Sequence, residues 1–158
     1  MRHIVGVSEM KVSNQPGDVI VTHSLGSCIG IAIYDPKAEV GGLLHFQLPL
    51  SRDNQERARE NPFMYADTGI PLLFRAAYQL GADKKHMVVK VAGGARVLDN
   101  NNFFNIGQRN YIAMKKIFWK NGVFIQSEDV GGDTWRTMSL EIGAGQVWIK
   151  NCQGAFEL

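Results

Sequence analysis

The chain has 158 residues, 45% of them hydrophobic, and its 17 basic and 15 acidic residues leave a formal charge of +2. These values predict one domain over residues 1–158, and they argue against nucleic-acid partners, which need a concentrated positive field. No apolar run approaches the ~20 residues of a membrane span, and the N-terminus lacks a signal-peptide pattern, so we expect a cytoplasmic protein without membrane insertion.

The first fifty residues predict short β-strands. Val19–Thr22 follows a Pro-Gly-Asp turn, Ile29, Ile31 and Ile33 alternate with smaller residues, and Leu43–Phe46 follows two glycines. The next segment, Ser51–Asn61, is polar, has no apolar period and lies between two prolines. It predicts a mobile surface loop.

Two helices are predicted in the middle of the chain. The first begins at Asp67 or Thr68 and ends at Leu80, with Gly81 as its left-handed cap and Pro71 in its first turn. The second has Asn105 as its N-cap and extends to Gly122.

The remaining segments again predict strands. Met87–Val91 precedes a Gly-Gly pair, and Val123–Ile125 begins a strand after the second helix. Trp135–Ile142 and Gln146–Lys150 form a hairpin around a glycine-containing turn. Many strands with two separated helices favour an α+β fold in which mixed or antiparallel sheets pack as a sandwich flanked by helices on the outer faces.

Cys28 is the first candidate for chemistry. It lies at a predicted strand edge, between Gly26 and Gly30, which would leave room for a substrate carbonyl, and backbone N–H groups around Ser27 could face an oxyanion. A free cysteine is also a common small buried residue, and the local sequence alone favours that interpretation. The second cysteine, Cys152, follows a strand and is interpreted as structural.

His45 and Thr22 complete a candidate catalytic set. His45 lies on a strand that can pair with the one starting at Cys28, where its imidazole can accept the thiol proton. Thr22 can fix the histidine tautomer, as Asp or Asn does in other triads. His23 is a competing base, but on a strand it faces the opposite side from Thr22.

Two other enzyme classes fit less well. Gly26–Gly30 matches a nucleophile elbow with cysteine in place of serine, but a β-rich segment follows it where an α/β-hydrolase has a helix. The scattered histidines and two unpaired cysteines predict neither a metal site nor a disulfide framework.

Short segments that form one combined motif are spread in order over most of the chain. They are Thr22, Leu25–Cys28, His45, Leu48–Pro49, Tyr65–Thr68, Ala92–Ala95, Asn105–Gly107, Arg109–Asn110, Glu128–Asp129 and Gly131–Gly132. In this combination and order they resemble the chemoreceptor glutamine deamidases, the CheD family of bacterial chemotaxis. Ser24 departs from the family pattern, in which glycine is frequent at this position.

The resemblance implies that Cys28 is the nucleophile, His45 the base and Thr22 the third member, in a fold similar to the deamidating domain of cytotoxic necrotizing toxins. It also implies hydrolysis of glutamine side chains on the cytoplasmic helices of methyl-accepting receptors through a thioester, without a cofactor. Some relatives also hydrolyse receptor methyl esters.

A CheC-type phosphatase is a further partner implied by the resemblance. The alternative to an enzyme is a noncatalytic adaptor that binds receptor or phosphatase without turnover. The presence of all three residues Thr22, Cys28 and His45 argues against this alternative.

Overall fold

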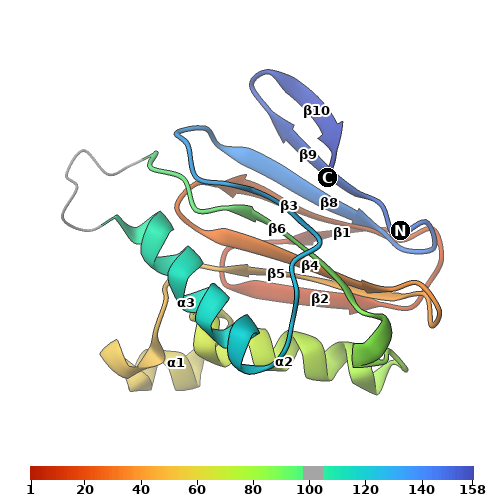
Figure 1. Ribbon diagram of the computed structural model, residues 1–158, viewed down its shortest axis with the longest axis horizontal. Coiled ribbons are helices and arrows are strands. Elements are labelled where there is room, and N and C mark those ends of the chain that lie inside the picture. Colours follow the sequence, from red (N-terminus) through yellow and green to blue (C-terminus); the bar gives the residue numbers. More distant parts are fainter. Residues whose placement is uncertain (98–104) are drawn as a thin grey trace.

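The computed structural model describes residues 1–97 and 105–158, which form two five-stranded β-sheets packed face to face (Figure 1). The first sheet has the strand order β1 (Arg2–Val5), β3 (Val19–Leu25), β8 (Arg136–Glu141), β9 (Val147–Asn151) and β10 (Gly154–Glu157). The second sheet has the order β2 (Glu9–Ser13), β5 (Val40–Phe46), β4 (Ile29–Asp35), β6 (Val88–Gly93) and β7 (Ser127–Val130).

Both sheets are mixed. The pairs β1–β3 and β6–β7 are parallel, whereas the other neighbours in each sheet are antiparallel. The hairpin predicted near the C-terminus is confirmed as β8–β9. The expected α+β sandwich is therefore confirmed.

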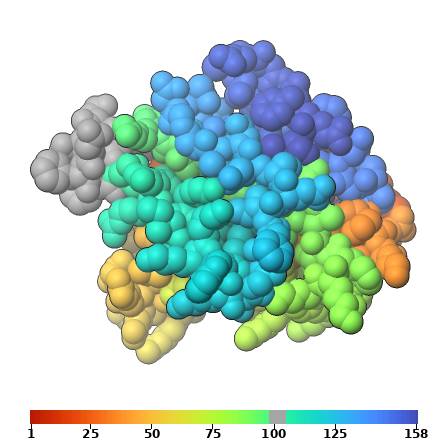
Figure 2. Space-filling model, viewed as in Figure 1, coloured from red at the N-terminus to blue at the C-terminus, as the bar shows by residue number. Residues whose placement is uncertain are grey.

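Two helices, α2 (Ala66–Gln79) and α3 (Ile106–Lys120), pack on the outer face of the second sheet. The short helix α1 (Gln55–Glu60) and the single 3-10 turns Ser51–Asp53, Pro62–Met64 and Lys84–His86 lie in the links between the larger elements. In the space-filling view α3 and the segment after it, teal to blue, form the front of the molecule, with α1 and α2 below (Figure 2). No helix of the described residues lies on the outer face of the first sheet, so the expectation of helices on both faces is wrong.

The alternating side chains of β4 divide the interior into two cores. Ile29, Ile31 and Ile33 pack against α2 and α3, where Leu73 and Met114 are fully buried. The residues between them face the first sheet, in a core that includes Met138 and Leu140 of β8. Because successive side chains of β4 alternate between these two cores, the strand is buried on both faces.

The polar segment Ser51–Asn61 is not the loop that the sequence predicts. Asn54 caps α1 by accepting a hydrogen bond from the Arg57 N–H at 3.1 Å. Ser51 is tied to α2 because its N–H and hydroxyl donate to Asp67 at 2.9 and 2.7 Å. A short helix that buries only Ala58 leaves no apolar period in the sequence.

The helix α2 begins earlier than predicted, and Pro71 therefore lies inside it rather than in its first turn. The first helical bond runs from the Gly69 N–H to the Tyr65 carbonyl at 2.8 Å. Pro71 lacks the N–H that would bond to the Asp67 carbonyl, so this helix tolerates one missing bond. Gly81 has the predicted left-handed conformation, with φ +108°.

The strand predicted at Val123–Ile125 is also wrong. Val123 and Ile125 pack on the helix-side core while Phe124 is exposed, so burial alternates as in a strand. Within the described ranges these residues belong to no ladder, and the Val123 N–H bonds back to the Phe118 carbonyl at 2.9 Å. The ladder begins at Ser127, which pairs with Lys90 of β6.

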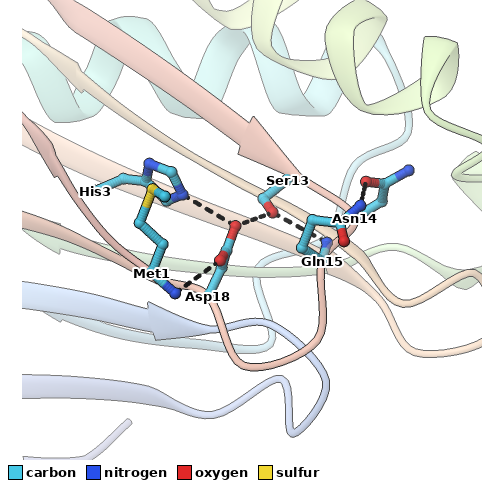
Figure 3. A network of polar contacts seen from close by, with 6 residues as sticks. All are labelled: Met1, His3, Ser13, Asn14, Gln15 and Asp18. Carbon is cyan, nitrogen blue, oxygen red and sulfur yellow. Dashed lines mark hydrogen bonds and ion pairs between the residues drawn. The ribbon is translucent and has the colours of Figure 1, made fainter.

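Asp18 joins the first three strands at one end of the sandwich (Figure 3). Its carboxylate accepts a hydrogen bond from the Ser13 hydroxyl at 2.7 Å and contacts the Met1 ammonium at 3.0 Å and His3 Nε2 at 2.9 Å. These contacts, that from Ser13 first, hold the pKa of Asp18 well below its usual range.

Candidate active site

The pairing of β4 with β5 places Cys28 and His45 on the same face of the second sheet. His45 pairs directly with Gly30, and Cys28 lies two residues before Gly30. Residues two apart on a strand point to the same side, and diagonal neighbours across a pair lie about 7–8 Å apart. This register places the segments of Cys28 and His45 side by side, without a hydrogen bond between the thiol and Nε2 of His45 among the described residues.

This shared face is the inner one. A methyl group placed on Gly30 would lie 2.9 Å from the Met138 sulfur and 3.1 Å from the Leu25 side chain, both on the first sheet. The absence of a side chain at Gly30 thus allows the sheets to pack closely, rather than clearing space for substrate as the sequence suggests. His45 has no exposed surface, whereas Cys28 is partly exposed.

Thr22 reaches His45 from the opposite sheet. Its Oγ1 lies 2.7 Å from His45 Nδ1 and also donates a hydrogen bond to the Val5 carbonyl at 2.7 Å. Because a carbonyl can only accept, the threonine proton points to Val5 and the oxygen accepts the proton of Nδ1. This arrangement leaves Nε2 as the unprotonated nitrogen, the form that a general base requires.

The free nitrogen of His45 is held without a partner. Nε2 is buried and has no hydrogen-bond partner among the described residues. Burial lowers the pKa of His45 to about 4, while the charge of Glu9 acts weakly in the opposite direction. The imidazole is therefore neutral near pH 7.

The thiol of Cys28 is also neutral near pH 7. Burial raises the pKa of Cys28 to about 11, and its own backbone N–H acts in the opposite direction. A neutral thiol and a neutral imidazole differ from a preformed thiolate–imidazolium pair. Attack by this sulfur requires transfer of its proton during the reaction.

The residues at the C-terminal end of β6 hold the backbone on both sides of Ser27. The Gly94 N–H donates to the Cys28 carbonyl at 2.9 Å, and the Ala95 N–H donates to the Gly26 carbonyl at 2.8 Å. A methyl group on Gly93, whose φ is +111°, would lie 2.2 Å from the Cys28 carbonyl oxygen. This close approach explains why a Gly-Gly pair follows the predicted strand Met87–Val91.

Gly26 and Ser27 precede the thiol in the link between β3 and β4. The space beside Gly26 is filled, since a methyl group there would lie 2.5 Å from Val97 and 2.8 Å from Trp135. Gly26 thus serves packing. Among the described residues, no backbone carbonyl accepts a hydrogen bond from the N–H groups of Ser27 and Cys28.

The remaining sequence candidates lie elsewhere. His23 is exposed on the outer face of β3, 3.3 Å from the Thr137 hydroxyl, and does not join the set. Cys28 precedes a strand rather than a helix, which excludes the nucleophile elbow of an α/β-hydrolase. Cys152 is exposed in the turn between β9 and β10, not in a packed position.

Sequence reasoning assigns no part in the site to Asn110 of α3. This buried side chain donates to the Ser27 carbonyl at 3.0 Å and to the Gln47 carbonyl at 2.9 Å. Two signals in the sequence point to it: the asparagine lies on the apolar side of a predicted helix, and Arg109–Asn110 is one of the segments that resemble the family.

Over residues 1–97 and 105–158, no group of three or more His, Cys, Asp or Glu side chains is arranged to hold a metal ion. Within the same ranges, no helix has the length and apolar character needed to cross a bilayer.

Comparison with known sequences defines the class to which this fold and site belong. The family described as "CheD chemotactic sensory transduction" matches residues 47–151, most of the chain. The chain belongs to the CheD family.

The matches to similar relatives extend over nearly the whole chain, including the part before residue 47. A protein of Syntrophus aciditrophicus, named "Probable chemoreceptor glutamine deamidase CheD 1", is 56% identical over 96% of this chain and 94% of its own length. Similarly named proteins of Solibacter usitatus and Anaeromyxobacter dehalogenans are 48% and 46% identical, over 93% of this chain and 87% and 92% of their own lengths.

Proposed function

We propose that this protein is a protein-glutamine amidohydrolase that converts glutamine side chains of chemotaxis receptors to glutamate, with Cys28 as nucleophile. The observation that carries the proposal is the Thr22–His45 hydrogen bond, which presents an unpaired Nε2 on the face that Cys28 shares. The family and the names of the relatives support the substrate class.

The first half of the reaction forms a thioester. His45 Nε2 takes the thiol proton as the Cys28 sulfur attacks the carboxamide carbon, and the C=O electron pair moves onto oxygen. The tetrahedral oxyanion then re-forms the carbonyl and breaks the C–N bond. The imidazolium gives its proton to the departing nitrogen, which leaves as ammonia.

The second half returns the enzyme to its starting state. Water attacks the thioester carbon while Nε2 accepts a water proton, and the C–S bond breaks as the sulfur recovers that proton. The products are a glutamate side chain and the free thiol, and no cofactor enters the balance. A receptor methyl ester would form the same thioester with loss of methanol.

Backbone N–H groups are the donors proposed for the oxyanion. The N–H groups of Ser27 and Cys28 are free of backbone acceptors within the described ranges, and that of Cys28 lies close enough to its own sulfur to influence the thiol pKa. Gly26 contributes by leaving room for the Val97 and Trp135 side chains to pack against the chain just before Ser27.

Ammonia release from a purified cytoplasmic receptor fragment tests the proposal. The parent protein is expected to release ammonia with a mass gain of about 1 Da per modified glutamine, whereas Cys28→Ala releases none. Equal release by both proteins, or none by either, would reject catalysis by Cys28 on this substrate. Methanol release from a methylated fragment tests the esterase activity.

The identity of the base is tested separately. His45→Ala is expected to abolish turnover, whereas His23→Ala, at an exposed position outside the site, retains it. The reverse result would assign the base to His23.

The noncatalytic adaptor remains the alternative function. It predicts receptor binding without ammonia release by the parent, and binding retained in Cys28→Ala alongside lost turnover would support the enzyme instead. A CheC-type phosphatase is proposed as a further partner on the family resemblance alone. Co-elution of the two purified proteins in size-exclusion chromatography tests this partner.

A further inference from the structure

Asn110 bridges the two segments that carry the proposed nucleophile and base. It lies on α3, 83 residues from Ser27 and 63 residues from Gln47, and its Nδ2 group bonds to both of their carbonyls. Ser27 immediately precedes Cys28, and Gln47 follows His45 by two residues. One amide thus uses both of its N–H protons to hold both segments.

The bond to Ser27 fixes the direction of the Cys28 N–H. Cis peptide bonds are absent from the described ranges, and in a trans peptide the C=O and N–H groups point in opposite directions. When the Ser27 oxygen points to Asn110, the N–H of Cys28 points away from α3. This N–H influences the pKa of the Cys28 thiol, so it lies beside the sulfur, where an oxyanion develops during acyl transfer.

The helix approaches closely enough for this contact because Gly107 lacks a side chain. A methyl group on Gly107 would lie 2.5 Å from the Gly94 carbonyl oxygen and 2.7 Å from that of Ala95. Gly94 and Ala95 are the residues whose N–H groups bond to the carbonyls of Cys28 and Gly26. The first turn of α3 and the end of β6 therefore pack together beside the segment Gly26–Cys28.

The arrangement is costly for stability alone. Asn110 has no exposed surface, and its Oδ1 atom is buried without a donor among the described residues. A buried acceptor without a partner destabilises a fold, whereas the two donated bonds satisfy the Ser27 and Gln47 carbonyls. The value of Asn110 therefore lies in the two segments that its amide holds.

We propose that Asn110 is a positioning residue that sets the direction of the Cys28 backbone N–H and thereby forms the oxyanion-binding geometry. The proposal rests on the proposed function for its biological substrate, but it concerns acyl transfer to Cys28 in general. Asn110 touches neither the substrate nor the reacting atoms, and it acts through the Ser27–Cys28 peptide.

The test compares two reactions of the same thiol, in a Cys152→Ser background so that only Cys28 reacts. Acylation by 4-nitrophenyl acetate passes through a tetrahedral oxyanion, whereas alkylation by iodoacetamide does not. In Asn110→Ala we expect the acylation rate to fall about tenfold or more and the alkylation rate to change less than about threefold. Cys28→Ala supplies the background rate.

Two further variants separate positioning from loss of fold. Met114→Ala removes another fully buried side chain of α3 and should leave the ratio of the two rates unchanged, although it destabilises the protein. Asn110→Asp keeps the side-chain volume but replaces the donor group, and it should lose acylation as Asn110→Ala does.

An unchanged ratio in both Asn110 variants, or an equal loss of ratio in Met114→Ala, would overturn the proposal. Ammonia release from the receptor fragment distinguishes failure of the Asn110 proposal from failure of the proposed function. If the parent is acylated at Cys28 but releases no ammonia, the function is wrong, and the ratio still decides the role of Asn110.

Discussion

Thr22 Oγ1 and His45 Nδ1 lie 2.7 Å apart, and this hydrogen bond connects the two sheets through the interior of the sandwich. The Thr22 hydroxyl donates its hydrogen bond to the Val5 carbonyl, so it can only accept from His45, and the contact fixes which histidine nitrogen is unprotonated. The neutral hydroxyl thus takes the orienting role without adding a charge to a buried site.

Replacement of Thr22 by valine should therefore slow turnover. The change keeps the shape of the side chain but removes the acceptor of the Nδ1 proton, so the imidazolium formed during the reaction loses a hydrogen bond. A bond to a charged group contributes about 1.5–3 kcal/mol, which corresponds to a fall in kcat of about 10- to 100-fold. Thr22→Ser should retain most activity. Thr137→Val, at the threonine beside His23, is the matched control, and an equal loss there would contradict the assignment.

The pH dependence of Cys28 alkylation should report a neutral resting pair. With the pKa of the thiol raised to about 11, only a small thiolate fraction exists near pH 7. The rate with iodoacetamide, measured by mass in Cys152→Ser, should rise about tenfold per pH unit and level off only near that pKa. A plateau between pH 6 and 8 would instead indicate a preformed thiolate–imidazolium pair.

The buried imidazole should also make the protein less stable in acid. His45 has a pKa of about 4 in the fold against 6.5 as the reference value, so between these values the unfolded chain binds a proton that the folded chain does not. The free energy of unfolding is therefore unaffected by this histidine above about pH 6.5. It decreases as the pH falls towards 4, by up to about 3 kcal/mol.

Urea unfolding across that pH window measures this effect. His45→Gln should flatten the decline in the free energy of unfolding, whereas His23→Gln, at an exposed position, should leave the decline as in the parent. A decline that persists unchanged in His45→Gln would assign the acid sensitivity to other groups.

Gly93→Ala should damage both stability and activity. Its methyl group would lie 2.2 Å from the Cys28 carbonyl at a backbone φ of +111°, so the nucleophile segment must shift. Overpacking and backbone strain together should lower the free energy of unfolding by about 2–4 kcal/mol. Gly81→Ala is the matched control because Gly81 has φ +108° but no atom within 4 Å. Activity lost equally in both variants would mean that general destabilisation, not displacement of Cys28, is responsible.

Ser24→Gly should stabilise the protein slightly. Ser24 is exposed and has φ +58°, next to an irregularity in the pairing of β3 with β8. Glycine adopts this conformation without strain, so a gain of up to about 1 kcal/mol in thermal or urea unfolding is expected. Ser24→Ala, which keeps the Cβ atom, should show no gain, and stabilisation by alanine would contradict the explanation.

Local sequence determines much of what positions the site. The alternation of Ile29, Ile31 and Ile33 predicts β4, and the same period places Cys28 and Gly30 together on the other face. The apolar spacing in the sequence predicts helices α2 and α3, and the observed ends differ from the predicted ones by one or two residues. Where the pattern was weak, as in α1, or misleading, as at Val123–Ile125, the sequence prediction was wrong.

The motif residues suggested Cys28, His45 and Thr22 as partners, but only the tertiary structure brings Thr22 to His45 from a different sheet. The two-residue alternation along a strand predicts which face of the strand a side chain occupies. It does not predict which sheet that face packs against, because strand pairing depends on contacts between distant residues. Asn110 lies 83 residues from the carbonyl it binds, so no local pattern relates the two. The sequence by itself pointed to Cys28 as the proposed nucleophile and to His45 as its strand partner, whereas the packing of two sheets and one helix decided the tautomer, the pKa values and the fixed backbone around Cys28.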